Sequence, residues 1–407
     1  MTSVSRSSGA TLLVALSVVA LSCTAASAEP ADTALRWNEI AQQTVAPVNA
    51  YIQSRSMAIT QLAVLEAVTR SVGSKAVAKA DTASPDAAVM AAAHAALLAL
   101  RPDSAAALDA ALDAELAKLE DGEPKTNGIA VGKAAAGDIL ARRKTDGWDA
   151  KVEYKLAGSP GIWVPTPPNS APALVPHWGK VTPFALKTSD QFRPGAPSSL
   201  DSARYLDDLR EVLEMGAATS SKRPPEMTEA AKFWTISAVQ GWNPAARQVS
   251  LANKRNLADN AHTLALLNVA MADALIACFD AKYTYNSWRP VTAIRTGVGD
   301  IKPVADWLPL IVTPPFPAYP SGHACAAGAA QEVLEHRFGP DRHAITLTSA
   351  AAPGVVFEYV SFKAIADQID DARVYGGIHI REDQTAGRTL GKEVGRYVYE
   401  TLAQAVP

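Results

Sequence analysis

The sequence is poor in cysteine and in aromatic residues. Its 407 residues include 3 cysteines, and only 6% of them are aromatic. So few cysteines exclude a fold that disulfides hold together. For Cys278 and Cys325 we expect two buried free thiols, with a disulfide between them as the alternative. Acidic and basic residues nearly balance, at a formal net charge of −3, which predicts no nucleic-acid partner and no basic patch for an anionic membrane.

Alanine supplies much of the hydrophobic content, and alanine favours helices over strands. The sequence shows no internal repeat and no alternating pattern typical of a strand. We therefore predict an all-α fold of packed helical bundles. Helical spacing of apolar residues is found over residues 36–46, 56–71, 103–121, 125–143 and 256–285, and a further helix is expected after Ser84 as its N-cap.

The first 28 residues have the pattern of a signal peptide. A short apolar run follows Arg6, and the small residues 26–28 suit cleavage before Glu29. The alternatives are a single membrane anchor or a lipoprotein that uses Cys23. No later stretch reaches ~18 uninterrupted apolar residues, so we expect no membrane span after cleavage. The pattern predicts an exported protein, either periplasmic or secreted.

A proline-rich segment separates two helical regions. Nine prolines occur between Pro160 and Pro197, which excludes a long helix there. Aromatic residues are interleaved with these prolines, unlike the composition of a disordered chain. We predict an ordered, extended belt wrapped on the helical body, with a mobile inter-domain linker as the alternative. The predicted organisation is a signal peptide (1–28), an N-terminal helical region (29–145), the belt (146–200) and a C-terminal helical core (201–407).

The motif "PSGH" joins a proline-rich loop to an alanine-rich segment that reads as a helix. Its histidine, His323, follows Ser321 and Gly322. Gly322 lets a ligand approach the backbone closely, and free N–H groups at a helix start bind anions. The Ser321 hydroxyl is a further donor. The motif therefore predicts an oxyanion cradle with a proton-transfer residue beside it, and the alternative is an ordinary helix cap with a surface histidine.

Two further segments carry cations and a second histidine. In "KYTYNSWRP", Lys282 and Arg289 are seven residues apart, which would place them on one face of a helix. In "ARVYGGIHIREDQ", a pair of glycines separates Arg373 from His379, and Asp383 follows four residues later. On one helix face, Asp383 could take the ring N–H of His379 and raise the basicity of the other nitrogen. The alternatives are surface cations and an exposed histidine–aspartate contact.

Taken together, the three segments resemble the superfamily of vanadium-dependent haloperoxidases, type 2 phosphatidic-acid phosphatases and bacterial acid phosphatases. The resemblance covers the last ~120 residues, where the order and spacing of three motifs agree. One departure is Ala372, where many members have serine; it puts details of the hydrogen bonding in doubt. The matching residues are Lys282, Arg289 and Pro290, then Pro320, Ser321, Gly322 and His323, then Arg373, His379 and Asp383.

As a haloperoxidase, the chain would hold vanadate, and the resemblance implies the roles of its residues. His379 would bond vanadium, with Asp383 behind it, and His323 would be the acid–base residue. Lys282, Arg289, Ser321, Gly322 and Arg373 would hold the oxygens, and Lys282 would also polarise the bound peroxide. The implied partners are hydrogen peroxide, a halide and a small organic acceptor, and a homo-oligomer is compatible with them. Phe316 stands at a position that is often phenylalanine in chloroperoxidases, which favours chloride as a substrate.

The same motifs leave two other functions open. In an exported acid phosphatase, His379 would attack phosphorus to form a phosphohistidine, and His323 would protonate the leaving alcohol. A non-catalytic oxyanion-binding protein would keep the same cage. We favour the haloperoxidase, because the lipid phosphatases have several membrane spans and the bacterial acid phosphatases are considerably shorter. The contexts "NSWRPVTAIR" and "FPAYPSGHA" also resemble haloperoxidases.

Overall fold

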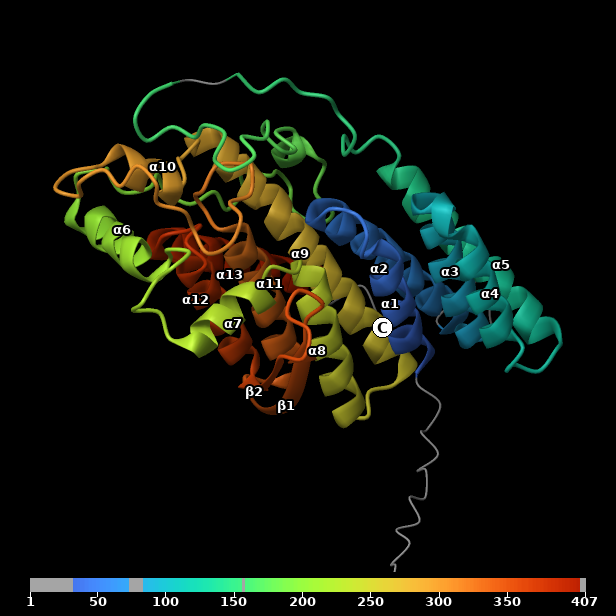
Figure 1. The fold of residues 1–407 in the computed structure, drawn as a ribbon. Coiled ribbons are helices and arrows are strands. Elements are labelled where there is room, and N and C mark those ends of the chain that lie inside the picture. The colour runs from blue at the N-terminus through green and yellow to red at the C-terminus, as the bar shows by residue number, and fades with distance from the viewer. Residues whose placement is uncertain (1–31, 73–82, 156–157, 403–407) are drawn as a thin grey trace, which may run out of the picture. The chain divides into compact units, whose positions relative to one another are not determined.

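The computed structural model describes residues 32–72, 83–155 and 158–402, and these residues are mostly helical, as predicted (Figure 1). The predicted signal peptide, residues 1–28, lies outside the described residues. The helices are α1 Thr33–Val45, α2 Ala50–Val72, α3 Pro85–Leu100, α4 Ala105–Leu116, α5 Glu123–Arg143, α6 Ala203–Met215, α7 Pro225–Phe233, α8 Ala238–Ala252, α9 Leu257–Tyr285, α10 Pro290–Thr296, α11 Gly322–Phe338, α12 Phe362–Tyr375 and α13 Arg381–Leu402; the strands are β1 Asp341–Thr348 and β2 Val356–Ser361.

The N-terminal helices pack closely because one of them carries glycines on its buried face. Helix α3 begins as expected, with Ser84 accepting the N–H of Ala87. Helix α5 crosses α3 at Gly128 and Gly132, where an added Cβ would lie 2.4 Å and 2.2 Å from backbone oxygens of α3 and its cap. Larger residues at these two positions would force the two helices apart.

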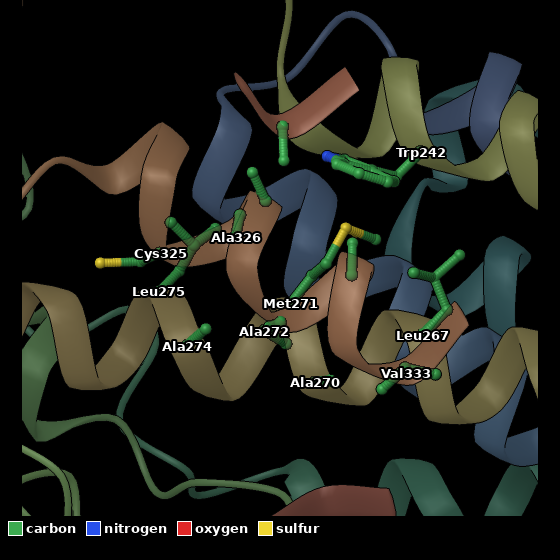
Figure 2. Packing of buried hydrophobic residues seen from close by; sticks show 14 of the residues in the cluster. Trp242, Leu267, Ala270, Met271, Ala272, Ala274, Leu275, Cys325, Ala326 and Val333 are labelled. Atoms are coloured by element: carbon green, nitrogen blue, oxygen red, sulfur yellow. The ribbon is translucent and has the colours of Figure 1, made fainter. Parts of the chain in front are cut away.

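The long helix α9 is the centre of the C-terminal core. It packs against α2, α11 and α13, and α11 and α13 also pack against each other. Figure 2 shows how side chains of α9, such as Met271 and Leu275, meet small residues of α11, such as Ala326. Among the described residues, α9 alone is long and apolar enough to cross a membrane, but 94% of its most apolar stretch is buried inside the protein.

In its described residues the proline-rich belt is extended and lies on the helical core, as predicted, with a short 3₁₀ turn at Trp178–Lys180. Two aspartates of α9 hold it. The buried carboxylate of Asp273 accepts the backbone N–H groups of Phe184, Ala185 and Leu186 at 2.6–3.0 Å. Asp280 forms an ion pair with Arg193 at 2.6 Å. Two of the aromatic residues of the belt, Trp163 and Trp178, are buried.

Strands β1 and β2 form an antiparallel hairpin that the sequence interpretation missed. The strands are short, and although burial alternates along most of β1, β2 exposes Val356 and Val360, so the pattern of the hairpin is weak beside that of the helices. The hairpin supports the loop between α7 and α8. Ser349 donates its hydroxyl to the Phe233 carbonyl at 2.8 Å, and Tyr359 and Trp234 both donate to Gln368.

Candidate oxyanion-binding site

The three segments singled out in the sequence come together at one cavity. The cavity has a volume of about 580 Å³, and Gly322, His323, Arg373 and His379 contribute to its lining. Lys282 and Arg289 lie beneath it and are fully buried. Buried cations without carboxylate partners are costly, so their convergence on one cavity indicates an anionic ligand.

Lys282 and Arg289 reach the site from different elements, so the predicted single helix face is wrong. Helix α9 ends at Tyr285, and Asn286 follows in the left-handed conformation with φ 51°. Arg289 is the residue before α10, and Pro290 begins that helix instead of ending the previous one. Proline suits the first turn of a helix because its missing N–H would have no acceptor there.

Backbone carbonyls hold both cations in place. Lys282 donates its Nζ hydrogens to the carbonyls of Pro317 and Ala318 at 2.8 Å and 2.7 Å. Arg289 donates from Nε to Phe316 O and from Nη1 to Ile378 O, both at 2.8 Å, while its Nη2 has no acceptor within the described part of the chain. Burial lowers the pKa of Lys282 to about 8 and that of Arg289 to about 10. A bound anion would stabilise the charged forms of both side chains.

Helix α11 starts at the "PSGH" motif, as predicted. Ser321 is the N-cap, and its side chain accepts the N–H of Ala324 at 3.5 Å. The N–H groups of Gly322 and His323 lie in the first turn, where no carbonyl of the helix can accept them. An added Cβ on Gly322 would stand 4.0 Å from the Lys282 Cε. The helix start therefore adds neutral donors to the buried cations.

His323 lines the cavity, and a backbone carbonyl fixes the orientation of its ring. Its Nε2–H donates to the carbonyl of Ile236 at 3.0 Å, so in the neutral imidazole Nδ1 carries no proton. Burial and the nearby Arg373 lower the pKa of His323 to about 3. The imidazole is therefore neutral at physiological pH and can accept a proton in a reaction only if negative charge enters the site.

Arg373 and His379 lie on either side of a sharp turn. Arg373 is in the last turn of α12, and Gly377 turns the chain with φ 80°. A side chain there would also meet the Gly216 carbonyl at 2.4 Å. Helix α13 begins at Arg381, so His379 stands before the helix and not on a helix face, which corrects the sequence interpretation. Arg373 donates from Nη1 to Trp234 O at 2.8 Å, and its Nε has no acceptor in the described structure.

The predicted contact between His379 and Asp383 is present. His379 donates its Nδ1–H to Asp383 Oδ2 at 2.8 Å, and the N–H of Ile380 reaches the same oxygen at 3.3 Å. The Nε2 of His379 is thus unprotonated and accepts a hydrogen bond from Arg289 Nη1 at 3.1 Å. Burial and the surrounding cations keep the pKa of His379 well below its usual value, while burial raises the pKa of Asp383.

Two contacts join the segments to one another. The backbone N–H of Ser321 donates to the carbonyl of Asp383 at 2.9 Å, which ties the start of α11 to the start of α13. The ring of Phe316 is buried under the cations, with its centroid 5.1 Å from Lys282 Nζ and 4.9 Å from Arg289 Cζ. Phe316 thus supports both cations through its ring face.

Part of the site could not be found from the sequence. Tyr51 of α2 and Leu174 of the belt line the cavity, and Tyr51 packs on Phe316 with ring centroids 6.0 Å apart. The carbonyls of Trp234 and Ile236 hold Arg373 and His323. Every residue has a backbone carbonyl, so these contacts leave no signal in the sequence.

The residues present fit a tetrahedral oxyanion. Arg289 Nη2 and Arg373 Nε are buried N–H donors without a described acceptor, and Lys282 adds a third positive charge. The unprotonated Nε2 of His379 provides a lone pair next to these donors. Among the described residues, no group of three or more histidine, cysteine or acidic side chains could hold a metal cation. The donor set therefore suits vanadate or phosphate.

Comparison with known proteins agrees with this geometry. The family model for the second helical-bundle domain of vanadium chloroperoxidase matches residues 262–406, which include every residue of the predicted site. The vanadium chloroperoxidase of Curvularia inaequalis is 29% identical over 220 residues. Residues 262–406 are thus identified as a domain of the vanadium chloroperoxidase type.

Solved structures of haloperoxidases share the fold over nearly the whole chain. The first bacterial vanadium-dependent iodoperoxidase superposes with a TM-score of 0.80 at 26% identity, covering 92% of this chain and 98% of that one. A bacterial vanadium-dependent chloroperoxidase in its holo form has a TM-score of 0.73 at 17% identity, covering 93% and 96%. The match to the Curvularia haloperoxidase spans 44% of this chain and about a third, 36%, of that protein.

Proposed function

We propose that the chain is a vanadate-dependent haloperoxidase. It oxidises a halide with hydrogen peroxide to a hypohalous acid, which halogenates a small organic acceptor. In this reaction one oxygen atom passes from the peroxide to the halide, one proton is consumed and one water is released. The site must therefore hold an oxyanion, admit peroxide and halide, and deliver a proton.

The observation that carries the proposal is the pair of unsatisfied guanidinium donors beside an unprotonated histidine. Arg289 Nη2 and Arg373 Nε are buried without acceptors in the described structure, and Arg289 also contacts Nε2 of His379 at 3.1 Å. An oxyanion bonded to that nitrogen would place oxygens within reach of both guanidiniums. The hydrogen bonds from the two guanidiniums would stabilise the bound anion strongly, because charge-assisted hydrogen bonds are strong where water is excluded.

The residues then have separate tasks. Vanadate, when bound, supplies a Lewis-acidic centre that activates peroxide. His379 holds it through Nε2, and Asp383 keeps the proton on Nδ1. Lys282, Arg289, Arg373 and the N–H groups at the start of α11 neutralise its oxygens. His323 takes up and returns a proton through Nδ1, because the carbonyl of Ile236 fixes its Nε2–H.

Haloperoxidase relatives support halide oxidation over phosphate-ester hydrolysis, but they do not agree on the halide. One relative is named a chloroperoxidase and another an iodoperoxidase. The buried Phe316 favours chloride in our proposal, because an apolar ring excludes water from the halide position. Its contacts with both cations mean that the same ring also shapes the anion cage.

Two assays on one preparation test the proposal. The purified mature protein, reconstituted with orthovanadate and given peroxide, bromide and a phenolic dye, should halogenate the dye. Vanadate-free protein should be inactive, and phosphate should inhibit reconstitution because it competes for the same cations. A phosphatase would instead hydrolyse an aryl phosphate ester without vanadate and be inhibited by it. Ester turnover without halide oxidation would overturn the proposal, and oxyanion binding without either activity would identify a binding protein.

Two histidine variants separate binding from turnover. His379→Ala should lose the bond to vanadium and nearly all activity. His323→Ala should still bind orthovanadate but lose much of its turnover, because only proton transfer is removed. Equal loss of binding in both variants would contradict these separate tasks.

We also propose that the protein is exported to the periplasm or the medium. The support is the apolar run and the small residues before Glu29. Expression of the full chain in a bacterial host and N-terminal sequencing of the product test it. A mature start at Glu29 in the exported fraction is expected, and an intact N-terminus in the cytosol would contradict it.

A further inference from the structure

A second cavity, with different lining residues, lies against the oxyanion site. It has a volume of about 220 Å³, and Asp383 lines it, whereas His379 lines the main cavity. The hydrogen-bonded pair therefore stands between the two cavities. Four aromatic side chains contribute to the lining of the second cavity, beside prolines, serines and aliphatic residues: Tyr205, Tyr285, Trp288 and Tyr319. The proposed halide oxidation gives this space no task.

One polar atom at this cavity lacks a partner. The carboxylate of Asp383 accepts from His379 and Ile380 through Oδ2, but no described residue donates to its Oδ1. The side chain is only 3% exposed, and it borders the cavity. Oδ1 is not among the fully buried polar atoms without a partner, so it is accessible at the cavity, and a ligand there can donate an N–H or O–H to it.

The aromatic rings are held so that their hydroxyls are already used. Tyr285 and Tyr319 donate to the carbonyls of Pro194 and Gly195, at 2.6 Å and 2.8 Å, and their rings meet edge to face at 5.7 Å. The Nε1–H of Trp288 donates to the Tyr205 hydroxyl at 2.7 Å. These four residues therefore offer ring surfaces to a ligand, and aromatic faces attract cations.

The charges around the cavity favour a cation once an oxyanion neutralises Lys282 and Arg289, which also act on Asp383. Glu382 lies next to Asp383 in the chain, and its carboxylate accepts the hydroxyl of Ser198 at the cavity wall at 2.7 Å. Arg204 approaches Glu382 at 3.9 Å but is largely exposed, so solvent screens its charge. The main cavity, in contrast, is lined by Arg373 with Lys282 and Arg289 beneath it, and would repel a cation.

We propose that the second cavity is a binding site for a small organic ammonium ion. The ammonium group would donate to Asp383 Oδ1, and its apolar part would lie between the aromatic rings. The inference does not depend on halide oxidation, because it rests on the cavity, the unpartnered oxygen and the rings.

The belt forms part of the second cavity. Residues 160–162 and 197–200 form part of the cavity wall. They are fixed to the core by backbone hydrogen bonds, from Trp288 N to Gly161 O at 2.9 Å and from Trp163 N to Asn286 O at 2.7 Å. The cavity is therefore already formed without a ligand, which lowers the entropic cost of binding.

Calorimetric titration of the orthovanadate-loaded protein with benzylamine tests the inference, with benzyl alcohol as the neutral probe of similar shape. Benzylamine should bind at least about tenfold more tightly than benzyl alcohol, because it adds cation–π attraction and a charged donor. Equal affinities for the two probes, or no binding of benzylamine at millimolar concentration, would overturn the proposal.

Variants of the wall locate the binding. Tyr285→Leu removes a ring and should weaken benzylamine binding about tenfold, whereas Tyr285→Phe keeps the ring and should change it less than about threefold. Leu200→Trp should fill the cavity and abolish binding. Circular dichroism and orthovanadate affinity check that each variant folds. If Tyr285→Leu binds like Tyr285→Phe, or if folded Leu200→Trp still binds benzylamine, the ligand lies elsewhere and the inference is wrong.

Discussion

His379 Nδ1 and Asp383 Oδ2 lie 2.8 Å apart, with both side chains almost fully buried. This contact fixes the tautomer of the imidazole and directs its unprotonated Nε2 to the anion cage. Asp383 therefore belongs to both sites, because its carboxylate holds His379 at the anion cage and also borders the second cavity. The properties of the oxyanion site should therefore respond to changes behind the histidine as well as within the cage.

Replacing Asp383 with asparagine should weaken oxyanion binding. Asp383→Asn keeps the shape but removes the charge that supports the imidazole, so orthovanadate affinity should fall about 10–100-fold. Equilibrium dialysis measures this, with thermal unfolding to check the fold. Glu382→Gln is the matched control, because Glu382 contacts Ser198 and has no hydrogen bond to His379. Unchanged affinity in Asp383→Asn would contradict its supporting role.

Arg373 should not be replaceable by lysine. Arg373→Lys loses the Nε donor that has no described acceptor, and a lysine offers no planar fork to an oxyanion. The dissociation constant for phosphate should rise about tenfold in calorimetric titration. Arg388→Lys, which alters a guanidinium that pairs with Asp370, should bind phosphate normally. Equal effects of the two substitutions would contradict a specific role of the Arg373 guanidinium in the cage.

His323 should make the anion-free protein lose stability, relative to a variant without this imidazole, as the pH falls below about 6.5. His323 has a pKa of about 3 in the folded protein because of burial and Arg373, whereas an unfolded histidine titrates near 6.5. The unfolded state therefore binds more protons, and between pH 6.5 and 5.5 this costs up to about 1 kcal/mol.

Urea unfolding at the two pH values measures this loss. The variant His323→Gln should lose correspondingly less stability over the same interval, and saturating phosphate should reduce the loss in the native protein, because an anion offsets the cations. A pH dependence that is the same in the variant would exclude His323 as its source.

Cys278 and Cys325 should remain unreactive in the native protein. Both thiols are free and fully buried, which confirms that they form no disulfide here. A thiol reagent such as dithionitrobenzoate should label neither cysteine of the mature chain before unfolding and both afterwards. Rapid labelling of the folded protein would show that water reaches the interface of α9 and α11.

Phe316 should make the enzyme competent for chloride. The ring is buried against Lys282 and Arg289 and would keep water from the halide. Assays with chloride, bromide and iodide at mildly acidic pH should detect turnover with all three, and Phe316→His should reduce chloride turnover more than bromide turnover. Oxidation of bromide or iodide without any chloride oxidation would contradict this expectation.

The sequence by itself determined the elements whose signals are local. Ser84 and Ser321 mark helix starts because a cap bonds to residues only three positions away. The prolines of the belt exclude a helix through their own ring geometry. The spacing of the three motifs identified the cations and histidines of the site before their positions in space were known.

Only the tertiary structure decided how those residues are used. The helix break at Asn286 separates Lys282 from Arg289, and the carbonyls of Trp234 and Ile236 orient Arg373 and His323. The cavity beside Asp383 forms where the belt meets the core. Contacts of this kind join residues distant in the chain through backbone groups that every residue carries, so residue type cannot encode them and only packing brings them together.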